Sequence, residues 1–484
     1  MCGFIGIVGL PGTHAAPELY EGLIALQHRG QDAAGILSFD GMFHLRKQNG
    51  MVRDIFRAQD MTRLQGNLAI AHVRYPTVGM GSDQDAQPFY INFPFGVGMT
   101  HNGNLTNWVD LRSRQFPAVN ICMESSCDVE AILYAFAKGL QDAGAGASLV
   151  DRVRSGTASA FDMAKGAYSV CGLLSEGVMF GFRDPAGIKP CILGRRDSDA
   201  GVEWALASES VALDILGFHR VRDLRAGEAV ILETGKEPVF IQVGDKPHTP
   251  CIFELVYFSR PDSFLDEISV YKTRRRFGES LAEQWVASGA PKPDVVIPIP
   301  DSARDSALSM AHALDVSYRE GFVKNRYIGR TFIMPNNEAR KKSIHRKLNP
   351  IPLEFEGKDV LLVDDSIVRG NTSGRIIEAA RAAGARNVYF ATTSPPLVAV
   401  CPYGIDMATQ KDFVAQGRSV DEVRQAIGAD HLVYLELDRM VDCARVGNPE
   451  IKGFCTGCFT GEYPTADAVE HIDALSAERA SARD

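Results

Sequence analysis

Residues 360–373 of the chain read VLLVDDSIVRGNTS. The four aliphatic residues predict a buried β-strand, which ends in two adjacent acids, Asp364 and Asp365. A loop with glycine and hydroxyl side chains follows, and a helix is predicted from Ser373 to Ala383. Backbone N–H groups of such a loop form an anion site, and the acids can reach sugar hydroxyls or Mg²⁺. An isolated acid pair would more often be solvated before an ordinary turn, but the strand–loop–helix order favours a phosphate-binding loop.

The same alternation of strands and helices extends through the second half of the chain. Residues 295–300 read VVIPIP and precede a helical stretch at residues 306–314. Short aliphatic strands that alternate with helices predict an open parallel sheet. This pattern begins after a stretch with glycine and prolines from Gly244 to Pro250, which indicates a domain boundary.

The first half of the chain has a different pattern. Residues 4–9, FIGIVG, predict a buried strand, and residues 18–28 have the spacing of an amphipathic helix. Short β-rich runs, such as residues 67–74 and 202–208, alternate with a few helices. At the other end of the chain, the polar, alanine-rich residues 465–484 predict a frayed helix or disorder.

Composition and charge limit the class of protein. The 484 residues allow two large domains or three smaller ones, and 45% hydrophobic residues are ordinary for a globular chain. The net charge of −9 argues against a nucleic-acid-binding surface over the whole chain. No apolar run of about 18 residues and no secretory signal pattern occur, so we expect no membrane partner and a cytoplasmic location. The ten cysteines then indicate thiols, metal ligands or catalytic groups rather than a disulfide framework.

Residues 323–348 form a strongly basic segment between the predicted strands. Its cations include Lys324, Arg326, Arg330, Arg340, Lys341, Lys342, Arg346 and Lys347. A solvated basic face and a nucleic-acid patch are both known forms of such a run. In an acidic chain, beside a phosphate-binding loop, a lid that neutralises pyrophosphate and excludes water is the better interpretation.

The N-terminus offers a candidate nucleophile. Cys2 follows Met1, whose removal would place a thiol and a free α-amine on one residue. An α-amine has a pKa of about 7.7–8.0, so it can act as the base without a separate histidine. For Cys2 alone, a chance cysteine is the better interpretation. Three motifs reverse this: LQHRGQDAAG at residues 26–35, AHVRYPT at 71–77 and HNGNL at 101–105.

These three motifs resemble class II glutamine amidotransferases with the N-terminal-nucleophile fold. Residues 360–373 resemble the phosphoribosyl pyrophosphate (PRPP) signature of type I phosphoribosyltransferases, and the basic segment resembles the catalytic loop of the glutamine PRPP amidotransferase family. The resemblance, which covers residues 2–464, implies a fold of the α/β and α+β classes. It places an αββα glutaminase at residues 2–240, a type I phosphoribosyltransferase domain with a mainly parallel sheet at residues 250–464, and a polar tail at residues 465–484.

The resemblance also implies a reaction. Glutamine would form a thioester at Cys2 and release ammonia, which would cross a shielded channel and displace pyrophosphate from PRPP. The products would be glutamate, pyrophosphate and 5-phosphoribosylamine, in the first step of de novo purine biosynthesis. The family further implies a homo-oligomer, often a tetramer, that purine nucleotides inhibit. Other class II amidotransferases share only the first domain, a PRPP-binding regulator would have no need of Cys2, and a paralogue that serves another pathway stays open.

By the same resemblance, several residues have named roles in glutamine hydrolysis. Cys2 is the nucleophile, Asn102 and the Gly103 backbone form the oxyanion hole, Arg74 binds the substrate carboxylate, Asp128 binds the substrate ammonium, and Arg29 lies close to the site. The family usually has Asn where this chain has Asp85, and Ser is common at the position of Cys127. We expect His28, His72 and His101 to be structural, because the α-amine fills the role of the base.

The resemblance places the PRPP site in the second domain. The residues expected to contact PRPP are Asp364, Asp365, Ser366, Arg369, Gly370, Asn371, Thr372, Ser373, Lys324 and Arg330. One Mg²⁺ ion per subunit is expected on Ser302, Asp364 and Asp365. The family often has glycine directly after the position of Ser302, where this chain has Ala303.

Four cysteines resemble the ligands of a cluster. Cys455 and Cys458 form a C-x-x-C pair, which alone is compatible with a zinc half-site, a redox pair or coincidence. Family members that also have cysteines at the positions of Cys251 and Cys401 carry a 4Fe-4S cluster. Other members lack the cysteines and the cluster. Four thiolates suit Zn²⁺ as well as iron–sulfur, and the resemblance favours an iron–sulfur cluster in a structural role.

Overall fold

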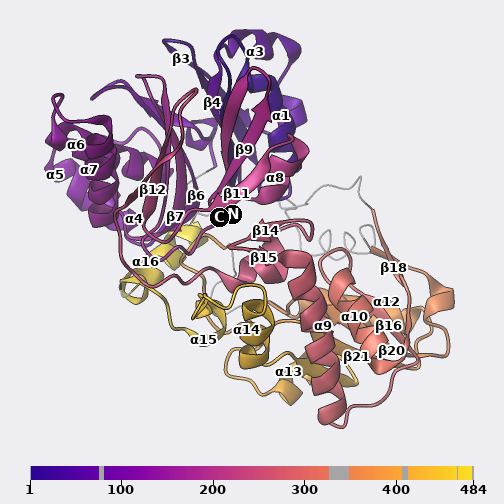
Figure 1. Ribbon diagram of the computed structural model, residues 1–484. Coiled ribbons are helices and arrows are strands. Elements are labelled where there is room, and N and C mark those ends of the chain that lie inside the picture. Colours follow the sequence, from indigo (N-terminus) through magenta and orange to yellow (C-terminus); the bar gives the residue numbers. More distant parts are fainter. Residues whose placement is uncertain (1, 76–80, 326–347, 406–412, 466, 482–484) are drawn as a thin grey trace.

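The computed structural model describes residues 2–75, 81–325, 348–405, 413–465 and 467–481. The chain folds into two bodies that lie against each other, and Figure 1 draws the N-terminal body in indigo to magenta and most of the C-terminal body in red to yellow. None of the helices in these described residues is long and apolar enough to span a bilayer.

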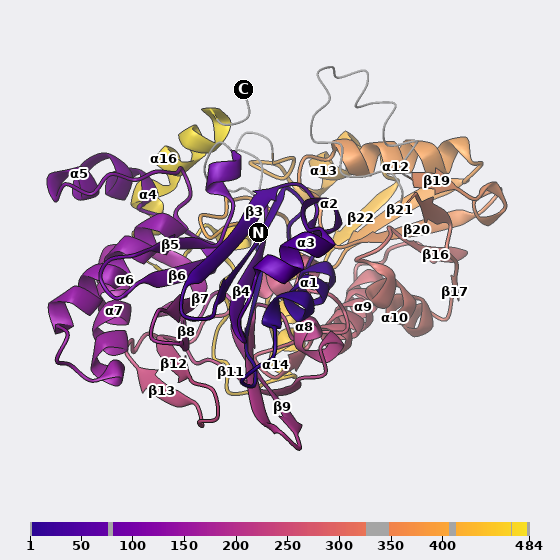
Figure 2. The ribbon, with the colours of Figure 1, turned by 90° about the horizontal axis from the view of Figure 1, so that it is seen from above.

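Two antiparallel sheets lie face to face at the centre of the N-terminal body (Figure 2). The first sheet contains β1 (Gly3–Val8), β2 (Ala33–Phe39), β3 (Phe43–Asn49), β4 (Leu68–Arg74), β9 (Ile192–Ser198), β10 (Gly201–Ala207) and β11 (His219–Asp223), in the order β11-β9-β10-β1-β4-β2-β3. The second sheet contains β5 (Phe89–Ile91), β6 (Val97–Leu105), β7 (Gly166–Leu174), β8 (Val178–Arg183), β12 (Glu228–Leu232) and β13 (Val239–Gln242), in the order β13-β12-β8-β7-β6-β5.

Helices cover both outer faces of this pair of sheets. Helices α1 (Ala15–Ala25) and α8 (Ser210–Ile215) pack on the first sheet, whereas α6 (Val129–Ala143) and α7 (Leu149–Met163) pack on the second. Shorter helical turns are α2 (Val52–Ile55), α3 (Ala58–Arg63), α4 (Trp108–Asp110) and α5 (Phe116–Ala118). The expected four-layer αββα arrangement is therefore confirmed.

Strand β1 lies at the centre of the first sheet, between β10 and β4. Each of its residues is buried, as the apolar run at its start predicts. Its Gly6 lets the two sheets approach closely, because a Cβ there would lie 2.6 Å from Sγ of Cys171 on the opposite sheet. Phe4 and Met179 fill the space between the sheets. The start of β1, and with it Cys2, is thereby held in the middle of the molecule.

The C-terminal body is built on a parallel sheet of five strands. These strands are β16 (Val295–Pro298), β17 (Ser317–Tyr318), β20 (Asp359–Asp364), β21 (Asn387–Thr392) and β22 (His431–Tyr434), in the order β17-β16-β20-β21-β22. The helices are α9 (Val270–Ala287), α10 (Arg304–Leu314), α12 (Asn371–Ala382), α13 (Val420–Ile427) and α14 (Leu437–Arg445). Each neighbouring pair of strands is parallel. The carboxyl ends of β16 and β20, where the candidate phosphate residues follow, therefore meet at one edge.

Small elements complete this body. They are a π-helical turn at Glu254–Phe258, the hairpin β14 (Phe264–Leu265) and β15 (Ile268–Ser269), the pair β18 (Phe322–Lys324) and β19 (Leu348–Pro350), and the short helix α15 (Gly457–Thr460). The tail contains helix α16 (Ala468–Ser481). For this segment the sequence predicted either a frayed helix or disorder, and the structure has a helix. Asp467 accepts a hydrogen bond from the Thr106 hydroxyl at 2.5 Å, which ties the start of this tail to the N-terminal body.

Most expected elements are present with shifted ends. The helix expected at residues 18–28 already ends at Ala25, because Arg29 N–H bonds to the Leu26 carbonyl at 2.8 Å in a tight turn. The helix expected from residue 373 begins at Asn371, directly after Gly370, whose φ of 75° ends the loop. Both shifts come from backbone turns that apolar spacing does not encode.

The hairpin turn of β14 and β15 docks on the N-terminal body. Arg183 binds both carboxylate oxygens of Asp266, at 2.6 and 2.9 Å. Arg220 binds Glu267 at 2.8 Å. A second acid, Asp223, lies beside this contact, and burial together with the charge of Asp266 raises the pKa of Asp223 to about 7. Ionisation of Asp223 beside Asp266 therefore destabilises this contact at alkaline pH.

We expect Asp223→Asn to stabilise the protein above neutral pH. The unfolded acid has a pKa near 3.8, so the parent loses stability as the pH rises from about 4 to about 7, and then loses no more. Asn carries no charge and does not lose this stability. The stability difference between variant and parent should therefore grow from about pH 4 to about pH 7 and stay constant above it. Thermal unfolding at fixed scan rate from pH 4 to 9 measures the difference. The exposed Asp197→Asn is the control, and an advantage that does not change with pH would contradict the assignment.

Candidate active site

Cys2 lies where the two sheets of the N-terminal body meet. It precedes β1 of the first sheet, and its backbone N–H lies 3.4 Å from Oδ1 of Asn102 on β6 of the second sheet. Its Sγ lies 3.8 Å from the carbonyl oxygen of Tyr75. The side chain is only 5% exposed. A thiol in this position is shielded from water and sits beside a polar group of the opposite sheet.

Two candidate hydrogen-bond donors belong to β6, the strand whose Asn102 contacts the Cys2 backbone N–H. Within the described residues, the buried Nδ2 of Asn102 has no hydrogen-bond partner, although its Oδ1 faces Cys2 N–H. Gly103 has a φ of 153°, and a Cβ there would lie 2.1 Å from the Ala167 carbonyl oxygen on β7. Only glycine fits this position. Leaving a buried amide donor unpaired is costly, so the arrangement is typical of a site that receives an acceptor from a substrate.

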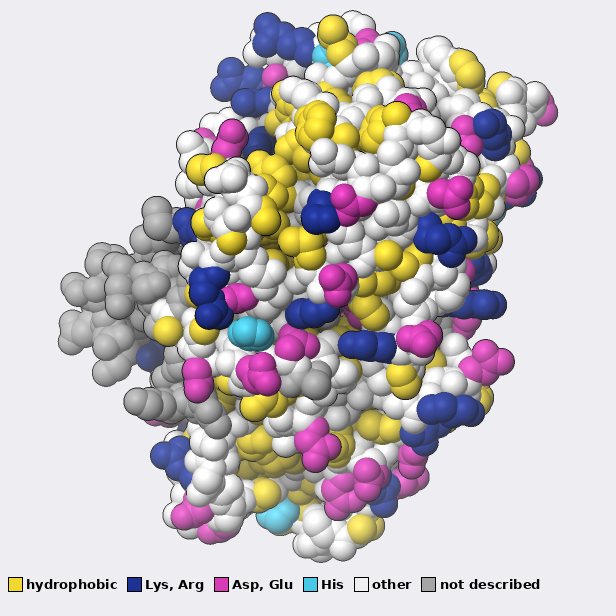
Figure 3. Space-filling view, turned by 90° about the vertical axis from the view of Figure 1, so that its left-hand side faces the viewer, with side chains coloured by type: hydrophobic (Ala, Val, Ile, Leu, Met, Phe, Trp, Pro, Cys, Tyr) yellow, Lys and Arg dark blue, Asp and Glu magenta, His cyan; other side chains and the backbone are white. Residues whose placement is uncertain are grey.

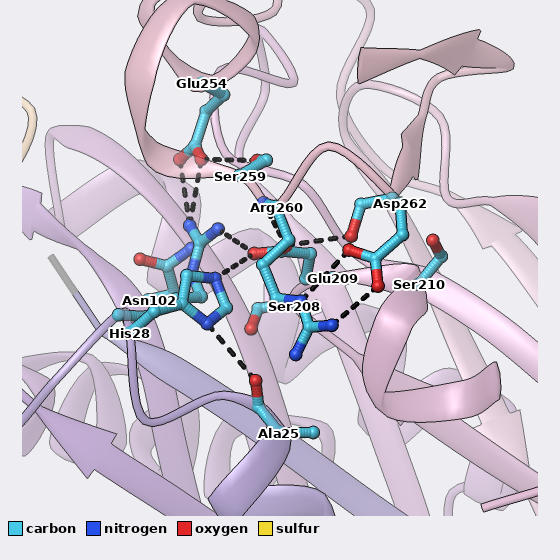
Figure 4. A network of polar contacts seen from close by, with 12 residues as sticks. Ala25, His28, Asn102, Ser208, Glu209, Ser210, Glu254, Ser259, Arg260 and Asp262 are labelled. Carbon is cyan, nitrogen blue, oxygen red and sulfur yellow. Dashed lines mark hydrogen bonds and ion pairs between the residues drawn. The ribbon is translucent and has the colours of Figure 1, made fainter. Parts of the chain in front are cut away.

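A network of polar contacts that includes Glu209 and Glu254 joins the two bodies (Figure 4), and Arg29 binds both of these carboxylates. Its Nε donates to the Cys2 carbonyl oxygen at 3.0 Å. Its Nη1 binds Glu209 at 2.6 Å, and its Nη2 binds both oxygens of Glu254 at 3.0 Å. Glu254 belongs to the C-terminal body, and the buried Lys189 lies 3.7 Å from it. The backbone of Cys2 is therefore fixed by a cation that carboxylates of both bodies hold.

The charges in this network favour their ionised forms. Burial opposes the cation of Arg29, but Glu254 and Glu209 outweigh it and raise the pKa of Arg29. Burial likewise opposes the carboxylate of Glu209, yet His28 and Arg29 lower the pKa of Glu209. His28 Nε2 lies 3.0 Å from that carboxylate. Sequence patterns indicated Arg29 but not Glu209 or Glu254, because neither glutamate stands at a recognisable spacing from its partner.

Arg74 and Asp128 approach the same site from two elements. Arg74 ends β4, and Asp128 precedes α6. Asp128 accepts a hydrogen bond from Leu105 N–H at 2.9 Å and lies 3.3 Å from His101 Nε2. Burial acts to raise the pKa of Asp128, but His101, the Leu105 N–H and Arg74 outweigh it, and the net effect lowers the pKa. The group is therefore a carboxylate at neutral pH. Burial opposes the Arg74 cation, while Cys127, Cys2, Asp85 and Asp128 raise the pKa of Arg74 above its ordinary value.

Asp85 connects the segments that carry these two residues. Its Oδ1 accepts a hydrogen bond from Ser126 N–H at 2.8 Å, and its Oδ2 accepts one from Ser82 N–H at 3.2 Å. Oδ2 also lies 3.9 Å from Arg74 Nη1. A carboxylate can accept from both backbone donors at once, whereas an asparagine has a single acceptor oxygen. The acid at this position therefore supports both Arg74 and the loop before Asp128.

The histidines near the site have structural partners. His72 Nε2 bonds to the His101 carbonyl oxygen at 3.0 Å, and burial, followed by His101 and Arg74, lowers the pKa of His72 well below its usual value. His101 Nδ1 lies 3.0 Å from Nε2 of Gln87. These contacts agree with a structural role for both histidines, and within the described part of the chain neither is hydrogen-bonded to Cys2.

The second candidate site lies at the carboxyl edge of the parallel sheet. Ser302, which follows β16, donates a hydrogen bond to Asp365, which follows β20. Ser366 Oγ donates to the other oxygen of Asp365 at 2.7 Å. Burial raises the pKa of Asp365, and burial together with the charge of Asp365 raises that of Asp364 well above its usual value. Asp365 is buried and Asp364 is half-buried, and these two adjacent carboxyl groups provide the oxygen donors that Mg²⁺ prefers.

The structure describes the whole candidate phosphate-binding loop, but only part of the basic segment. Gly370 caps the N-terminus of α12, so Asn371, Thr372 and Ser373 form its first turn. Lys324 Nζ lies 3.1 Å from Asp301, directly before Ser302, and so belongs to the same edge. The rest of the basic segment, from residue 326 to residue 347 and with Arg330, lies outside the described residues.

Arg274 lies between the two sites. Its Nε donates to the Leu255 carbonyl oxygen at 2.9 Å, and its Nη2 donates to that of Ser259 at 2.7 Å. Burial lowers the pKa of Arg274, and among the acids that oppose this shift Asp365 acts most strongly. The π-helical turn that carries Glu254 is thus held by a cation whose charge also acts on Asp365 of the second site.

The four candidate cluster cysteines come together from distant parts of the chain. Cys251 and Cys455 pair in a parallel β-bridge, and the Cys458 carbonyl oxygen accepts N–H groups of Val398 and Ala399, just before Cys401. All four side chains are buried. Burial, followed by Glu254 and Cys401, raises the pKa of Cys251 to about 12. Burial and the neighbouring thiols raise the pKa values of Cys455 and Cys458 well above their usual value.

The donor set at this place is four buried thiols on fixed backbone segments. Thiolates are the ligands of a 4Fe-4S cluster and also suit Zn²⁺. Over the described ranges, no three His, Cys, Asp or Glu side chains converge as ligands of a single ion do.

Comparisons with known proteins agree with this geometry. A family model described as a glutamine amidotransferase domain matches residues 72–214. The amidophosphoribosyltransferase of Escherichia coli (strain K12) is 46% identical over 494 residues, which cover 100% of this chain and 97% of that protein. That of Saccharomyces cerevisiae is 44% identical over 490 residues, with 99% and 96% covered.

A solved structure extends the likeness to the fold of the whole chain. The glutamine PRPP amidotransferase from B. subtilis, complexed with ADP and GMP, has a TM-score of 0.84 and 34% identity. The match covers 96% of this chain and 97% of that one. The chain therefore belongs to the amidophosphoribosyltransferase family and is a glutamine amidotransferase and pentosyltransferase of purine biosynthesis.

Proposed function

We propose that the N-terminal body hydrolyses glutamine at Cys2 and that the C-terminal body transfers the ammonia to PRPP. The observation that carries the first assignment is the buried Nδ2 of Asn102, which has no hydrogen-bond partner among the described residues and whose side-chain oxygen lies 3.4 Å from the Cys2 backbone nitrogen. Sγ attacks the amide carbon of glutamine, and the oxygen that becomes negative accepts hydrogen bonds from Asn102 Nδ2 and Gly103 N–H. The α-amine that removal of Met1 exposes takes the thiol proton and gives a proton to the leaving ammonia. Water then cleaves the thioester and yields glutamate.

The amino-acid part of glutamine is held by two opposite charges. Arg74 pairs with the substrate carboxylate and Asp128 with its ammonium group. Support comes from the shifted pKa values, which keep both groups ionised although both are buried. Arg29 is proposed to fix the Cys2 backbone rather than to touch substrate, because Glu209 and Glu254 already bind its guanidinium group.

At the second site, ammonia displaces pyrophosphate from C1 of PRPP and 5-phosphoribosylamine forms. The first turn of α12 and the loop from Asp364 to Ser373 are proposed to bind the ribose 5-phosphate, with Lys324 and Arg330 on the pyrophosphate side. Mg²⁺ held by Ser302, Asp364 and Asp365 would neutralise charge on the leaving pyrophosphate. Ammonia is proposed to pass along the contact between the bodies.

Several properties of the whole protein are part of the proposal. The domains are residues 2–240 and 250–464, and the tail is residues 465–484. Cys251, Cys401, Cys455 and Cys458 hold a 4Fe-4S cluster with a structural role, which iron and sulfide analysis of protein purified without air would test. Purine nucleotides inhibit the protein, because a relative with 34% identity was crystallised with ADP and GMP. The protein is proposed to be a cytoplasmic homo-oligomer.

The decisive experiment measures pyrophosphate release by protein purified without air. With PRPP and Mg²⁺ present, release should require glutamine or ammonia, and glutamate should form in the same amount as pyrophosphate in the glutamine reaction. Folded protein that binds PRPP but releases no pyrophosphate with either nitrogen donor would reject the assignment. Pyrophosphate release with ammonia but not with glutamine would reject only the proposed glutaminase activity.

A further inference from the structure

A loop of the C-terminal body lies directly against the strand that carries the candidate oxyanion donors. The loop consists of residues 401–405, and the strand is β6. Asn104 Nδ2 donates a hydrogen bond to the Pro402 carbonyl oxygen at 2.9 Å. Gly404 has a φ of 92°, and a Cβ there would lie 2.9 Å from the Gly103 carbonyl oxygen and 3.1 Å from its carbon. The two backbones are therefore in contact with no room for a side chain.

The opposite side of Gly103 is equally tight. A Cβ on Gly103 would lie 2.1 Å from the Ala167 carbonyl oxygen and 2.6 Å from Cα of Tyr168, both on β7. Gly103 and Tyr168 are also paired in the sheet. The Gly103 residue is thus clamped between β7 on one side and Gly404 on the other. A shift of the loop must move Gly103 and its neighbour Asn102, because β7 leaves no space for relaxation.

The loop itself is anchored in its own body. Tyr403 N–H bonds to Cys401 Sγ at 3.4 Å, and the Tyr403 hydroxyl lies 2.7 Å from the Thr465 hydroxyl. The Tyr403 hydroxyl also accepts a hydrogen bond from Thr465 N–H at 3.1 Å. Tyr403 is 1% exposed. The loop is therefore a fixed support and not a surface segment that could yield to β6.

We propose that the loop of residues 401–405 is a positioning element for the oxyanion hole, so that the C-terminal body sets the geometry in which glutamine is hydrolysed. This inference rests on the proposed role of Asn102 and Gly103. The donors of an oxyanion hole act mainly in the transition state, so a displaced donor lowers kcat and leaves KM nearly unchanged. Use of free ammonia needs no oxyanion hole and is unaffected.

Gly404→Ala tests the proposal, with Gly289→Ala as the matched control. Gly289 has a φ of 71°, and no atom lies within 4 Å of a Cβ built there, so the control shares the backbone strain but not the contact. We expect Gly404→Ala to lower kcat of glutamine hydrolysis on the order of 10²-fold, the effect of one impaired oxyanion donor. The KM for glutamine, the ammonia-dependent activity and the control variant should stay close to the parent.

A second variant covers the case in which Gly404→Ala does not fold. Tyr403→Phe removes the hydroxyl anchor and keeps the packing, and it should lower the same kcat to a smaller extent. Unchanged kcat in the folded variants, or equal loss of the ammonia-dependent activity, would overturn the proposal. Asn102→Ala separates this failure from failure of the proposed function. If Asn102→Ala lowers kcat and Gly404→Ala does not, only the positioning role is wrong, whereas no effect of Asn102→Ala rejects the oxyanion hole itself.

Discussion

Replacement of Cys2 by alanine should eliminate glutamine-dependent formation of 5-phosphoribosylamine and preserve the ammonia-dependent reaction. Without Sγ no thioester forms, and loss of a covalent nucleophile lowers turnover on the order of 10⁴-fold or more. The second site lies in the other body, where Ser302, Asp364 and Asp365 meet, and it does not contain this thiol. Pyrophosphate release with saturating glutamine, and separately with ammonium chloride at pH 8.5, measures the two activities.

The control for this variant is a cysteine that has no place at either site. Cys122 is exposed, and Cys122→Ala should retain both activities. Equal loss of both activities in Cys2→Ala, at unchanged thermal stability, would mean that the two reactions are not separate. Retained glutaminase activity would mean that another group is the nucleophile.

Asp365→Asn should have the opposite pattern and lower product formation with either nitrogen donor. The change removes a carboxylate from the candidate Mg²⁺ and PRPP site, and misplacement at a reacting centre costs on the order of 10²-fold. Stability should not fall, because burial raises the pKa of Asp365 above its usual value, so ionisation of this carboxyl group lowers the stability of the folded protein. Turnover with PRPP and ammonia, together with thermal unfolding at pH 8, measures both effects.

The matched control lies at the other end of the same strand. Asp359 begins β20 and binds Arg386 at 2.7 Å near the surface, so Asp359→Asn should leave turnover unchanged. A stable Asp365→Asn variant with full activity would exclude Asp365 from the site. A variant that is inactive and also unstable would indicate that the carboxylate supports the fold instead.

The parts of the site that could be predicted from the sequence are those encoded within one short segment. The strand that ends in Asp364 and the helix after Gly370 follow from local apolar runs and a glycine, and both are present. The start of β1 also follows from its apolar run, whereas the segment around Asn102 was indicated by its resemblance to a family motif. In each case the residues that do the chemistry are neighbours of the residues that form the element.

The parts that sequence patterns missed are contacts between distant segments. Glu209 and Glu254 bind Arg29 although 180 and 225 residues separate them from it. A single glutamate has no periodicity, and only the packed sheets bring it to its partner. The close approach of Gly404 to Gly103 is of the same kind, since a glycine in a loop has many explanations in sequence alone. The available signal was Arg29 itself: an arginine that is buried near a predicted active site needs carboxylate partners elsewhere in the chain.

The position of Glu254 has a consequence for synthesis of the protein on the ribosome. When residues up to about 240 have emerged, the turn with Arg29 and the strand with Cys2 are complete, but the second carboxylate that binds Arg29 is still missing. The loop around Gly404 emerges later still. A nascent or truncated chain therefore has the nucleophile without its full support. The order of the segments along the chain thus delays the full support of Cys2 until the C-terminal body has been synthesised.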